Sequence, residues 1–459
     1  MLKPNSTPTS VSGNRREFIK KASTAAAVVA TANLFKTPVY GQNQAPSPGR
    51  VIGANDRIVV GFIGVGKQGM AHVNSQKENA ADNNITMAAV CDLSKYRVAE
   101  AQKTIGGDCK GYDDHRRLLE NKDIDAVTIA TVDHWHAGCG IDAVNAGKHV
   151  YGEKPMTRYL GEAFAYAEAV KNNKRIFQIG AQICSDASWQ KAAELIKAGK
   201  IGPVILAQDS YPRNAPKGEW NYDIEKWATA DDVNWDMWQK PVHHKTAFDK
   251  DAYFRWRKYY PYCAGTLGDL VPHRLHPLML ATGMPEFPTR VVALGNNPIH
   301  TDKLTPGTPE RDVPEQIEII AEFPSGLHIL VTTSTINWNG LPSVIRGHKA
   351  VLEMGVDSVD LKPQKEFSED IDPESYTHLV PSGQKIPEME KNWFSCIRSG
   401  QQPYGNIELA VRVQTVIALA EMSQRLNIMC LFDEKTKKIT TGDGKVIEPL
   451  TYGSMGEKS

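Results

Sequence analysis

The segment that most constrains the fold is DRIVVGFIGVGKQGMAHV, residues 56–73. Ile58 to Ile63 is an apolar run of strand length, a GxGxxG pattern follows it, and the sequence then becomes helical in character. Glycines at such positions let the backbone approach a pyrophosphate, which the N-terminus of the following helix stabilises. The segment therefore predicts a dinucleotide-binding site built on Gly64, Gly66 and Gly69.

A second apolar run, ITMAAVCD, ends at Asp92. Asp92 follows the glycines at about the spacing expected of the acidic residue that binds the adenine ribose. A carboxylate accepts hydrogen bonds from ribose hydroxyls and repels a 2′-phosphate, so NAD is favoured over NADP. Lys95 and Arg97 lie close enough in sequence to moderate that preference.

Helical and strand patterns alternate as far as Gly180, which predicts a doubly wound parallel sheet of about six strands. Ligands of such sheets gather at the carboxyl ends of the strands. Three stretches fall there: TVDHWH (Thr131 to His136), GEKP (Gly152 to Pro155) and GAQIC (Gly180 to Cys184).

The chain has 459 residues, more than one hydrophobic core usually serves, so we expect two domains. From Thr289 onward, short apolar and alternating runs are separated by turns that contain Gly and Pro, which predicts an antiparallel sheet. Residues 406–426 indicate a long amphipathic helix that returns to the body of the protein.

The N-terminus carries the pattern of a twin-arginine export signal. Arg15 and Arg16 precede a weakly hydrophobic run from Ala22 to Ala32, which is too short to cross a bilayer. We therefore expect a signal and leader over residues 1–50 and a periplasmic or otherwise exported protein with no membrane span in its mature form. The seven cysteines lack the spacing of a disulfide framework, so most should be buried thiols.

The net charge of the chain gives no reason to expect a highly charged partner. The 53 basic and 53 acidic residues balance, so nothing in the net charge favours a nucleic acid or an anionic membrane as partner. On this ground a small neutral substrate fits better.

The stretch GDLVPHRLHP, residues 268–277, places Asp269, His273 and His276 at helical spacing. On one helix they would share a face. The spacing is compatible with an acid/base pair, with packed histidines on a helix capped by Asp269, or with a metal site completed by Cys184.

Together these motifs resemble the glucose-fructose oxidoreductase and inositol dehydrogenase family, written Gfo/Idh/MocA. The matching features are GxGxxG, Asp92, the TxxHxH and EKP stretches, GxQ, AAELIKAGKIGPV (Ala192 to Val204) and DxxxH at Asp269 and His273. The resemblance covers roughly residues 56–435. It implies an α/β Rossmann doubly wound domain followed by an α+β domain with a large, mostly antiparallel open sheet, often used for oligomerisation.

On this basis we expect an NAD-binding domain over residues 51–180 and a substrate and oligomerisation domain over 181–459, in a dimer or tetramer. The resemblance implies that Lys154, Asp269 and His273 carry the chemistry and that the peptide bond after Lys154 is often cis. We assign no metal ligands. The cofactor-binding residues expected are Gly64, Gly66, Lys67, Gln68, Gly69, Asp92, Arg97, Thr131, His134, His136, Glu153, Lys154 and Gln182; those expected at the substrate are Lys154, Arg257, Tyr260, Asp269, His273 and His276.

These residues suit the roles. Oxidation of a secondary alcohol needs a base within hydrogen-bond reach of the hydroxyl, and His273 can serve near neutral pH. Asp269, one helical turn earlier, could hold its ring, and Lys154 could polarise the same oxygen. The sequence departs from the family at Cys184, where relatives often have arginine, and at Val271 and Pro272, where glycine is common before the histidine.

The stretch from Tyr211 to Tyr262 holds five of the nine tryptophans. Aromatic faces stack on sugar rings, although tryptophans that merely pack a long crossover would give the same pattern. Arg213, Arg255, Arg257 and His244 could bind hydroxyls or a carboxylate, and we favour Arg257 and Tyr260 as substrate contacts.

Three functions fit the sequence. The first is an exported NAD-dependent oxidoreductase acting on a hydroxyl of a sugar, sugar acid or cyclitol with a tightly bound cofactor. The second is an NAD-dependent glycosidase similar to glycoside hydrolase family 109, in which transient oxidation permits elimination of the aglycone. The third is a non-catalytic carbohydrate-binding protein with a structural nucleotide, since fold alone does not fix function.

Overall fold

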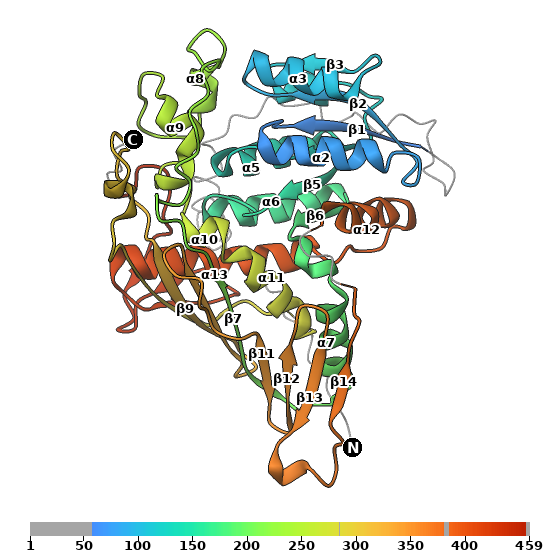
Figure 1. The fold of residues 1–459 in the computed structure, drawn as a ribbon, viewed down its shortest axis with the longest axis vertical. Coiled ribbons are helices and arrows are strands. Elements are labelled where there is room, and N and C mark those ends of the chain that lie inside the picture. The colour runs from blue at the N-terminus through green and yellow to red at the C-terminus, as the bar shows by residue number, and fades with distance from the viewer. Residues whose placement is uncertain (1–56, 284, 381–384, 456–459) are drawn as a thin grey trace, which may run out of the picture. The chain divides into compact units, whose positions relative to one another are not determined.

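The computed structural model describes residues 57–283, 285–380 and 385–455 (Figure 1). The expected signal and leader, residues 1–50, lie outside the described residues. Within the described part of the chain, no helix combines the length and apolar character that a membrane crossing requires.

The first layer is a parallel sheet whose six strands lie in the order β3-β2-β1-β4-β5-β6. The apolar runs that predict strands form the centre of this sheet, and every residue of β1 is buried. The strands are β1 (Ile58–Ile63), β2 (Ile85–Cys91), β3 (Lys110–Tyr112), β4 (Ala126–Ile129), β5 (His149–Glu153) and β6 (Phe177–Gly180). The predicted doubly wound sheet is confirmed, and its strand order reverses between β1 and β4, where ligands of such sheets bind.

Helices cover both faces of this sheet: α2 (Lys67–Glu78), α3 (Lys95–Ile105), α4 (His115–Leu119), α5 (Asp133–Asn145) and α6 (Leu160–Asn173). Ser94 begins α3 because its side chain accepts a hydrogen bond from the Arg97 N–H, and Asp114 begins α4 in the same way. A helix from near the C-terminus, α12 (Ile386–Ser399), also packs on α2, β5 and β6 (Figure 1). Residues beyond 180 therefore contribute an element to the first layer.

The second sheet has eleven strands in the order β14-β13-β12-β11-β7-β10-β9-β8-β15-β16-β17. All its neighbours pair antiparallel except β7 and β10, which confirms the predicted mostly antiparallel sheet. The strands are β7 (Val204–Pro212), β8 (Arg290–Asn296), β9 (Gln316–Glu322), β10 (His328–Ser334), β11 (Val344–Gly347), β12 (Ala350–Met354), β13 (Val359–Pro363), β14 (Glu374–Tyr376), β15 (Cys430–Phe432), β16 (Ile439–Thr440) and β17 (Val446–Ile447).

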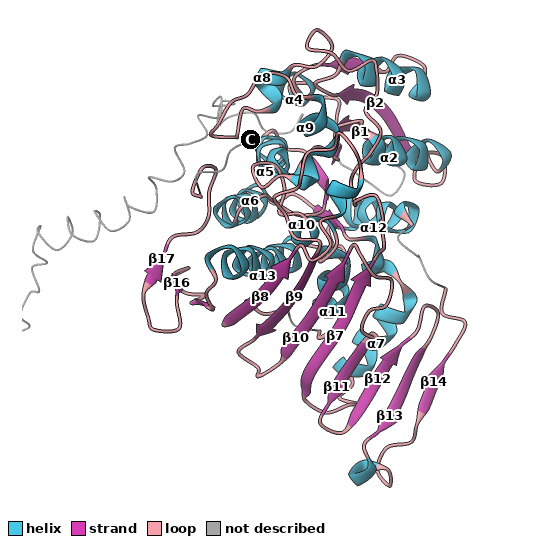
Figure 2. Ribbon diagram, turned by 60° about the vertical axis from the view of Figure 1, so that its left-hand side comes forward, coloured by secondary structure: helices cyan, strands magenta, loops and turns pink. Residues whose placement is uncertain are grey.

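One face of the second sheet is covered by helices α7 (Ala187–Lys197), α11 (Pro272–Ala281) and α13 (Ile407–Leu426), while no helix of the described residues covers the face turned toward the viewer in Figure 2. The alternating burial of β9 follows from this arrangement, because one side chain in two meets the helices. Asn406 begins α13 by accepting hydrogen bonds from two backbone N–H groups, as the predicted helix start requires. Helix α13 also packs on α6, which joins the two layers.

Residues 213–262 form an insertion with little regular structure, as expected. It contains α8 (Trp235–Trp238), α9 (Lys250–Arg255) and the short turn η3 (Trp256–Lys258), and α10 (Thr266–Asp269) follows it. The other short turns are η2 (Gln182–Ser185), η4 (Thr301–Leu304) and η5 (Lys365–Phe367). All seven cysteines are buried and unpaired.

Candidate active site

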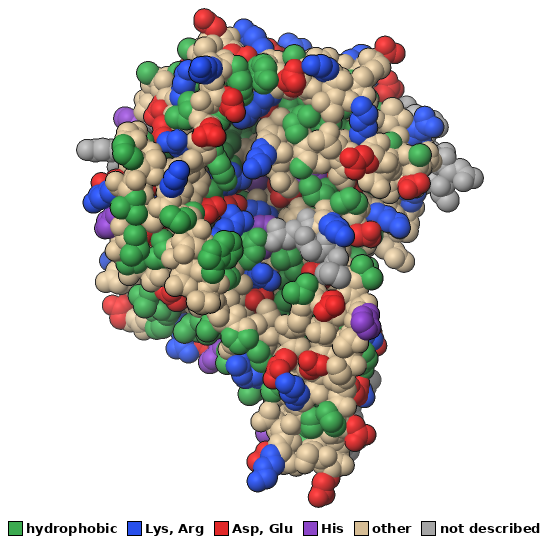
Figure 3. All heavy atoms as spheres, in the orientation of Figure 1, with side chains coloured by type: hydrophobic (Ala, Val, Ile, Leu, Met, Phe, Trp, Pro, Cys, Tyr) green, Lys and Arg blue, Asp and Glu red, His purple; other side chains and the backbone are tan. Residues whose placement is uncertain are grey.

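A cavity of about 850 Å³ lies at the carboxyl ends of β1, β2, β4 and β5 and is lined by both halves of the chain. Figure 3 shows this face of the molecule hollowed, with Lys and Arg side chains around the hollow. Fourteen of the residues predicted for the site line this cavity: Gly64, Gly66, Lys67, Gln68, Asp92, Arg97, Thr131, His136, Glu153, Lys154, Gln182, Arg257, Asp269 and His273.

The glycine loop between β1 and α2 is built for close backbone approach. Gly64 has φ +82°, and a Cβ there would lie 2.7 Å from the carbonyl oxygen of Ala130. A Cβ on Gly69 would lie 2.0 Å from the carbonyl oxygen of Gly64, so Gly69 packs the helix on the loop and does not itself line the cavity. The free N–H groups of the first turn of α2 then suit a pyrophosphate.

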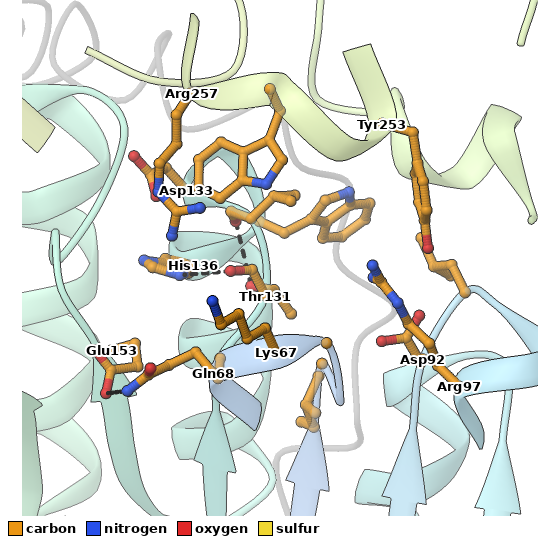
Figure 4. Close-up of a pocket in the computed structure, with 18 of the residues that line it drawn as sticks. Lys67, Gln68, Asp92, Arg97, Thr131, Asp133, His136, Glu153, Tyr253 and Arg257 are labelled. Carbon is orange, nitrogen blue, oxygen red and sulfur yellow. Dashed lines mark hydrogen bonds between the residues drawn. The ribbon is translucent and has the colours of Figure 1, made fainter. Parts of the chain in front are cut away.

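Asp92 and Arg97 meet at the same end of the cavity (Figure 4). The Asp92 carboxylate accepts hydrogen bonds from the backbone N–H of Val65 at 2.9 Å and of Ser94 at 3.0 Å. The Arg97 guanidinium lies over the rings of Tyr253 and Trp227, at 4.9 and 5.5 Å from their centroids. This end therefore offers a fixed carboxylate for ribose hydroxyls and a fixed cation beside it.

Glu153, at the end of β5, is buried in a polar network behind the cavity. It accepts hydrogen bonds from Gln68 at 3.0 Å and from Gln182 at 2.9 Å, and it pairs with His72 Nε2 at 2.8 Å (Figure 4 shows the bond to Gln68). Burial by itself raises the pKa of Glu153, but the hydrogen bond and charge of His72 outweigh it and lower that pKa. The next peptide bond, Lys154 to Pro155, is cis.

Lys154 reaches across the cavity to the second domain. Its Nζ donates to Asp269 Oδ1 at 2.6 Å and to the Asp269 carbonyl oxygen at 2.8 Å. Asp269 Oδ2 accepts from Trp220 Nε1 at 2.9 Å, and Arg257 Nε lies 3.3 Å from Oδ1. Burial by itself raises the pKa of Asp269, but the charges of Lys154 and Arg257 outweigh it and hold that pKa well below its usual range.

The backbone around Pro272 explains why the Asp269 carbonyl takes no helical hydrogen bond from His273. Asp269 ends α10 and Pro272 is the first residue of α11, so the two residues belong to different helices. The His273 N–H turns to Leu270 O at 3.2 Å instead of bonding four residues back to Asp269. The Asp269 carbonyl can therefore accept from Lys154.

This geometry corrects the role expected of Asp269. It neither caps a helix nor holds the His273 ring, since no hydrogen bond or ion pair joins the two side chains. His273 Nδ1 has no hydrogen-bond partner among the described residues, and its ring lies 5.2 Å from that of Tyr211. Burial, and next the charge of Lys154, lower the pKa of His273 well below its usual value, so the imidazole is neutral.

Besides Gly69, three predicted residues lie outside the cavity. The Tyr260 hydroxyl donates to Gln424 at 3.0 Å, so this predicted substrate contact is a packing residue. His276 Nδ1 bonds to the Pro272 carbonyl at 2.8 Å, and His134 Nε2 bonds to the Trp238 carbonyl at 2.8 Å. Burial lowers the pKa of His276 to about 4 and that of His134 to about 3, so both are neutral structural histidines.

His136 and Thr131 line the cavity, and the His136 ring contacts two backbone carbonyl groups. His136 Nδ1 lies 2.6 Å from the Pro155 carbonyl oxygen, and its Nε2 lies 3.2 Å from that of Thr131. The imidazole therefore ties the loop after β4 to the loop after β5. Cys184 is buried, and no group of three or more His, Cys, Asp or Glu side chains within the described ranges is placed to hold a metal ion.

Several residues of the site were not assigned a role from the sequence. Trp220 was noticed only as one of many aromatics, yet it holds Asp269. Asp133 lines the cavity beside Arg257 (Figure 4), and burial raises its pKa. His72 has no local signal at all, because its second partner, Glu390, is 318 residues away.

These observations define a class. The chain is an α/β protein built on two sheets. A glycine loop of the dinucleotide-binding type lies at one end of its cavity, and Lys154, Asp269 and His273 lie at the other. Residues 58–181 match the family model described as "Oxidoreductase family, NAD-binding Rossmann fold", and residues 232–427 match the "Oxidoreductase family, C-terminal alpha/beta domain". The chain belongs to the Gfo/Idh/MocA oxidoreductase family, as its motifs predicted.

Relatives within the family have varied activities. A "Glycosyl hydrolase family 109 protein" of Shewanella baltica is 25% identical over 266 residues, which are 54% of this chain and 50% of that protein. An "Inositol 2-dehydrogenase" of Salmonella typhimurium is 29% identical over 147 residues, 32% of this chain and 43% of that protein. The chain thus matches half or less of the length of these curated relatives.

Two solved structures share the fold. An oxidoreductase domain protein from Kribbella flavida has a TM-score of 0.65 and 20% identity, covering 82% of this chain and 100% of that one. A levoglucosan dehydrogenase in complex with NADH and levoglucosan has a TM-score of 0.63 and 18% identity, covering 82% of this chain and 99% of that one. At 20% identity or less, these likenesses show a shared fold.

Proposed function

We propose that this protein is an NAD-dependent oxidoreductase that acts on a secondary hydroxyl of a carbohydrate. The observation that supports it most is that Lys154 and His273, from different domains, line the same cavity as the glycine loop. The named activities of the inositol and levoglucosan dehydrogenases agree with a carbohydrate substrate.

The residues at the cavity suit a nicotinamide dinucleotide. Gly64, Gly66 and the start of α2 would hold the pyrophosphate, and Asp92 would hold the adenine ribose. NAD is preferred over NADP because the Asp92 carboxylate would repel a 2′-phosphate, although the Arg97 cation lies beside it. When bound, the nicotinamide supplies the hydride acceptor.

The protein's side chains would then manage the proton. Oxidation of the alcohol to a ketone removes a hydride from carbon and a proton from oxygen. Neutral His273 can accept that proton, and the charged Lys154, fixed by Asp269, polarises the oxygen as negative charge develops on it. Trp220 and Lys154 together keep Asp269 from competing as the base.

The test is to purify the protein without added nucleotide, identify any bound nucleotide by mass spectrometry, and add carbohydrates while following the absorbance of reduced nicotinamide. We expect NAD(H) in the protein and a change in its redox state with at least one carbohydrate. Failure of the protein to bind either nicotinamide dinucleotide would refute the proposal.

A glycosidase that uses the same cofactor is the second candidate, and the match to a family 109 glycosyl hydrolase supports it. Transient oxidation would acidify the neighbouring C–H, so that the aglycone is eliminated; water would then add to the resulting unsaturated ketone, and return of the hydride would restore the sugar. Release of nitrophenol from a nitrophenyl glycoside without net NAD reduction would favour this candidate over the first.

Two wider features remain proposals. Export by the twin-arginine route rests on residues 14–35, and it suits a protein that folds around its cofactor before leaving the cytoplasm. A homo-oligomer through the helix-free face of the second sheet is supported by Leu294 on β8 and Ile320 on β9, which are 68% and 51% exposed.

A further inference from the structure

Arg257 extends into the cavity with most of its donors unused. Figure 4 shows its side chain beside Asp133 and above His136. Its Nε faces Asp269 Oδ1 at 3.3 Å, and the guanidinium lies 4.1 Å from the ring centroid of Trp256. Among the described residues, neither terminal nitrogen has a hydrogen-bond partner, although the side chain is only about a quarter exposed (26%).

A second guanidinium lines the same part of the cavity. Arg213 follows β7 and donates through Nη1 to Glu219 at 2.8 Å, and it lies 5.1 Å from the ring centroid of Tyr211. The charges of Arg213 and Lys154 both act on Asp269 and on His273, which places these cations around the same space.

The acceptors in this space are already occupied. Both oxygens of Asp269 are bonded, to Lys154 and Trp220, and Glu219 is paired with Arg213. Of the other acidic side chains on the cavity wall, Asp92 and Glu153 are hydrogen-bonded on the side of the glycine loop, and Asp223 and Glu225 are exposed. Asp133 lies beside Arg257 and accepts a hydrogen bond from Cys263, but among the described residues it forms no ion pair with Arg257. The terminal nitrogens of Arg257 therefore keep N–H donors that no acceptor among the described residues takes up.

We propose that Arg257 and Arg213 form a carboxylate-binding subsite and that the substrate is a sugar acid, such as an aldonate or a uronate. This inference rests on the proposed function and narrows its substrate class. A guanidinium presents two parallel N–H groups that match a carboxylate, and Asp269 and Trp256 hold Arg257 in place before the ligand arrives.

A substrate carboxylate would also improve the neighbouring base. The charges of Lys154, Arg213 and Arg274 contribute to lowering the pKa of His273, after burial. An anion among these cations would offset their effect and raise the pKa of His273 toward the range in which it accepts a proton readily. A neutral sugar would leave the imidazole a weaker base.

The test is isothermal titration calorimetry of the protein loaded with NAD⁺, using matched pairs of ligands: D-glucuronate and D-glucose, D-galacturonate and D-galactose, D-gluconate and D-glucitol. For at least one pair we expect the acid to bind about ten-fold more tightly than its neutral partner. The Arg257→Gln and Arg213→Gln variants should each lose about ten-fold in affinity for that acid. Arg290→Gln, on β8 and paired with Glu322, is the control and should lose nothing.

The NAD⁺ affinity of each variant is measured alongside. If Arg257→Gln weakens NAD⁺ and leaves the acid unaffected, the guanidinium belongs to the cofactor site and the proposal falls. It falls equally if no acid in the panel binds better than its neutral partner. If only neutral sugars are oxidised, the proposed function stands and this inference is wrong. If acids bind through the two arginines but no nicotinamide is reduced, this inference stands and the proposed function is wrong.

Discussion

At the scale of single residues, Asp269 organises the candidate active site. Its carboxylate contacts two cations, Lys154 and Arg257, and the indole of Trp220. A buried ion pair contributes little net stability compared with apolar residues, but removal of one partner leaves the other charge without compensation. Asp269 is therefore needed for its charge and not only for its shape.

The Asp269→Asn variant tests that role. We expect the free energy of unfolding to fall by about 3 kcal/mol because Lys154 would be left buried without its counter-ion. Turnover should fall by about 100-fold because Lys154 and Arg257 lose the group that orients them. Urea denaturation and steady-state kinetics measure the two effects, and NAD⁺ affinity serves as the control. A variant with wild-type turnover would show that Asp269 is dispensable.

Local spacing predicted which residues meet at this site better than it predicted their contacts. Asp269 and His273 were expected to touch because four residues separate neighbours on a continuous helix. Pro272 begins a new helix between them, so the carboxylate turns to Lys154. That partner directly follows β5, 115 residues earlier, and no local pattern indicates such a pair.

At the scale of elements, Glu390 on α12 joins that helix to α2, on the cofactor side of the protein. His72 on α2 is fully buried, with Nε2 2.8 Å from Glu153 and Nδ1 2.7 Å from Glu390 on α12. Glu390 also accepts from Ser75 at 2.6 Å and Gln76 at 2.9 Å. His72 thus positions Glu153, the residue before Lys154.

This arrangement predicts a loss of stability in alkali. Burial by itself lowers the pKa of His72, but its hydrogen bonds to Glu153 and Glu390 outweigh burial and raise it to about 9. Because the pKa of His72 is higher in the folded state than in the unfolded state, protonation of His72 stabilises the folded protein. This stabilisation is fully present below the ordinary pKa of about 6.5 and is lost as the pH rises through 9. Between these values the free energy of unfolding should fall by about 1.4 kcal/mol per pH unit from this group.

Urea denaturation at several pH values from 6 to 10 measures the slope. The His72→Gln, Glu390→Gln double variant keeps a polar network without the ionisable histidine, and its stability should vary less over this range. Equal slopes in the wild type and the double variant would show that His72 is not charged in the folded protein. His72 and Glu390 could not be paired from the sequence, because α12 follows β7 to β14 of the second sheet and is far from α2 along the chain.

At the scale of the whole molecule, the predictable part was the arrangement of strands. The parallel sheet and its ligand-binding edge follow from apolar runs and glycines that act within about 20 residues. The second sheet was recognised as antiparallel, but the parallel pairing of β7 with β10 was not, because those strands are far apart in sequence. The cavity depends on that long-range assembly, since Arg213 follows β7 and Asp269 lies after the insertion.

The insertion packs against the loop at the Asp92 end of the cavity. Asp232 accepts hydrogen bonds from Ser94 Oγ at 2.6 Å and from the Tyr96 N–H at 2.9 Å, and the Lys95 N–H donates to its carbonyl at 3.2 Å. These contacts join the insertion to the loop after β2, next to Asp92. The two halves of the molecule therefore enclose one space, in which a cofactor and a substrate would meet.

The central claim is that Lys154 and His273, supplied by the two halves, act on one substrate against one nicotinamide. The most direct test is single-turnover hydride transfer in protein loaded with NAD⁺, followed by the absorbance of reduced nicotinamide, in the wild type and in the Lys154→Ala and His273→Ala variants. We predict that both variants bind NAD⁺ normally and transfer hydride at least about 100-fold more slowly. Hydride transfer at the wild-type rate in either variant would contradict this account.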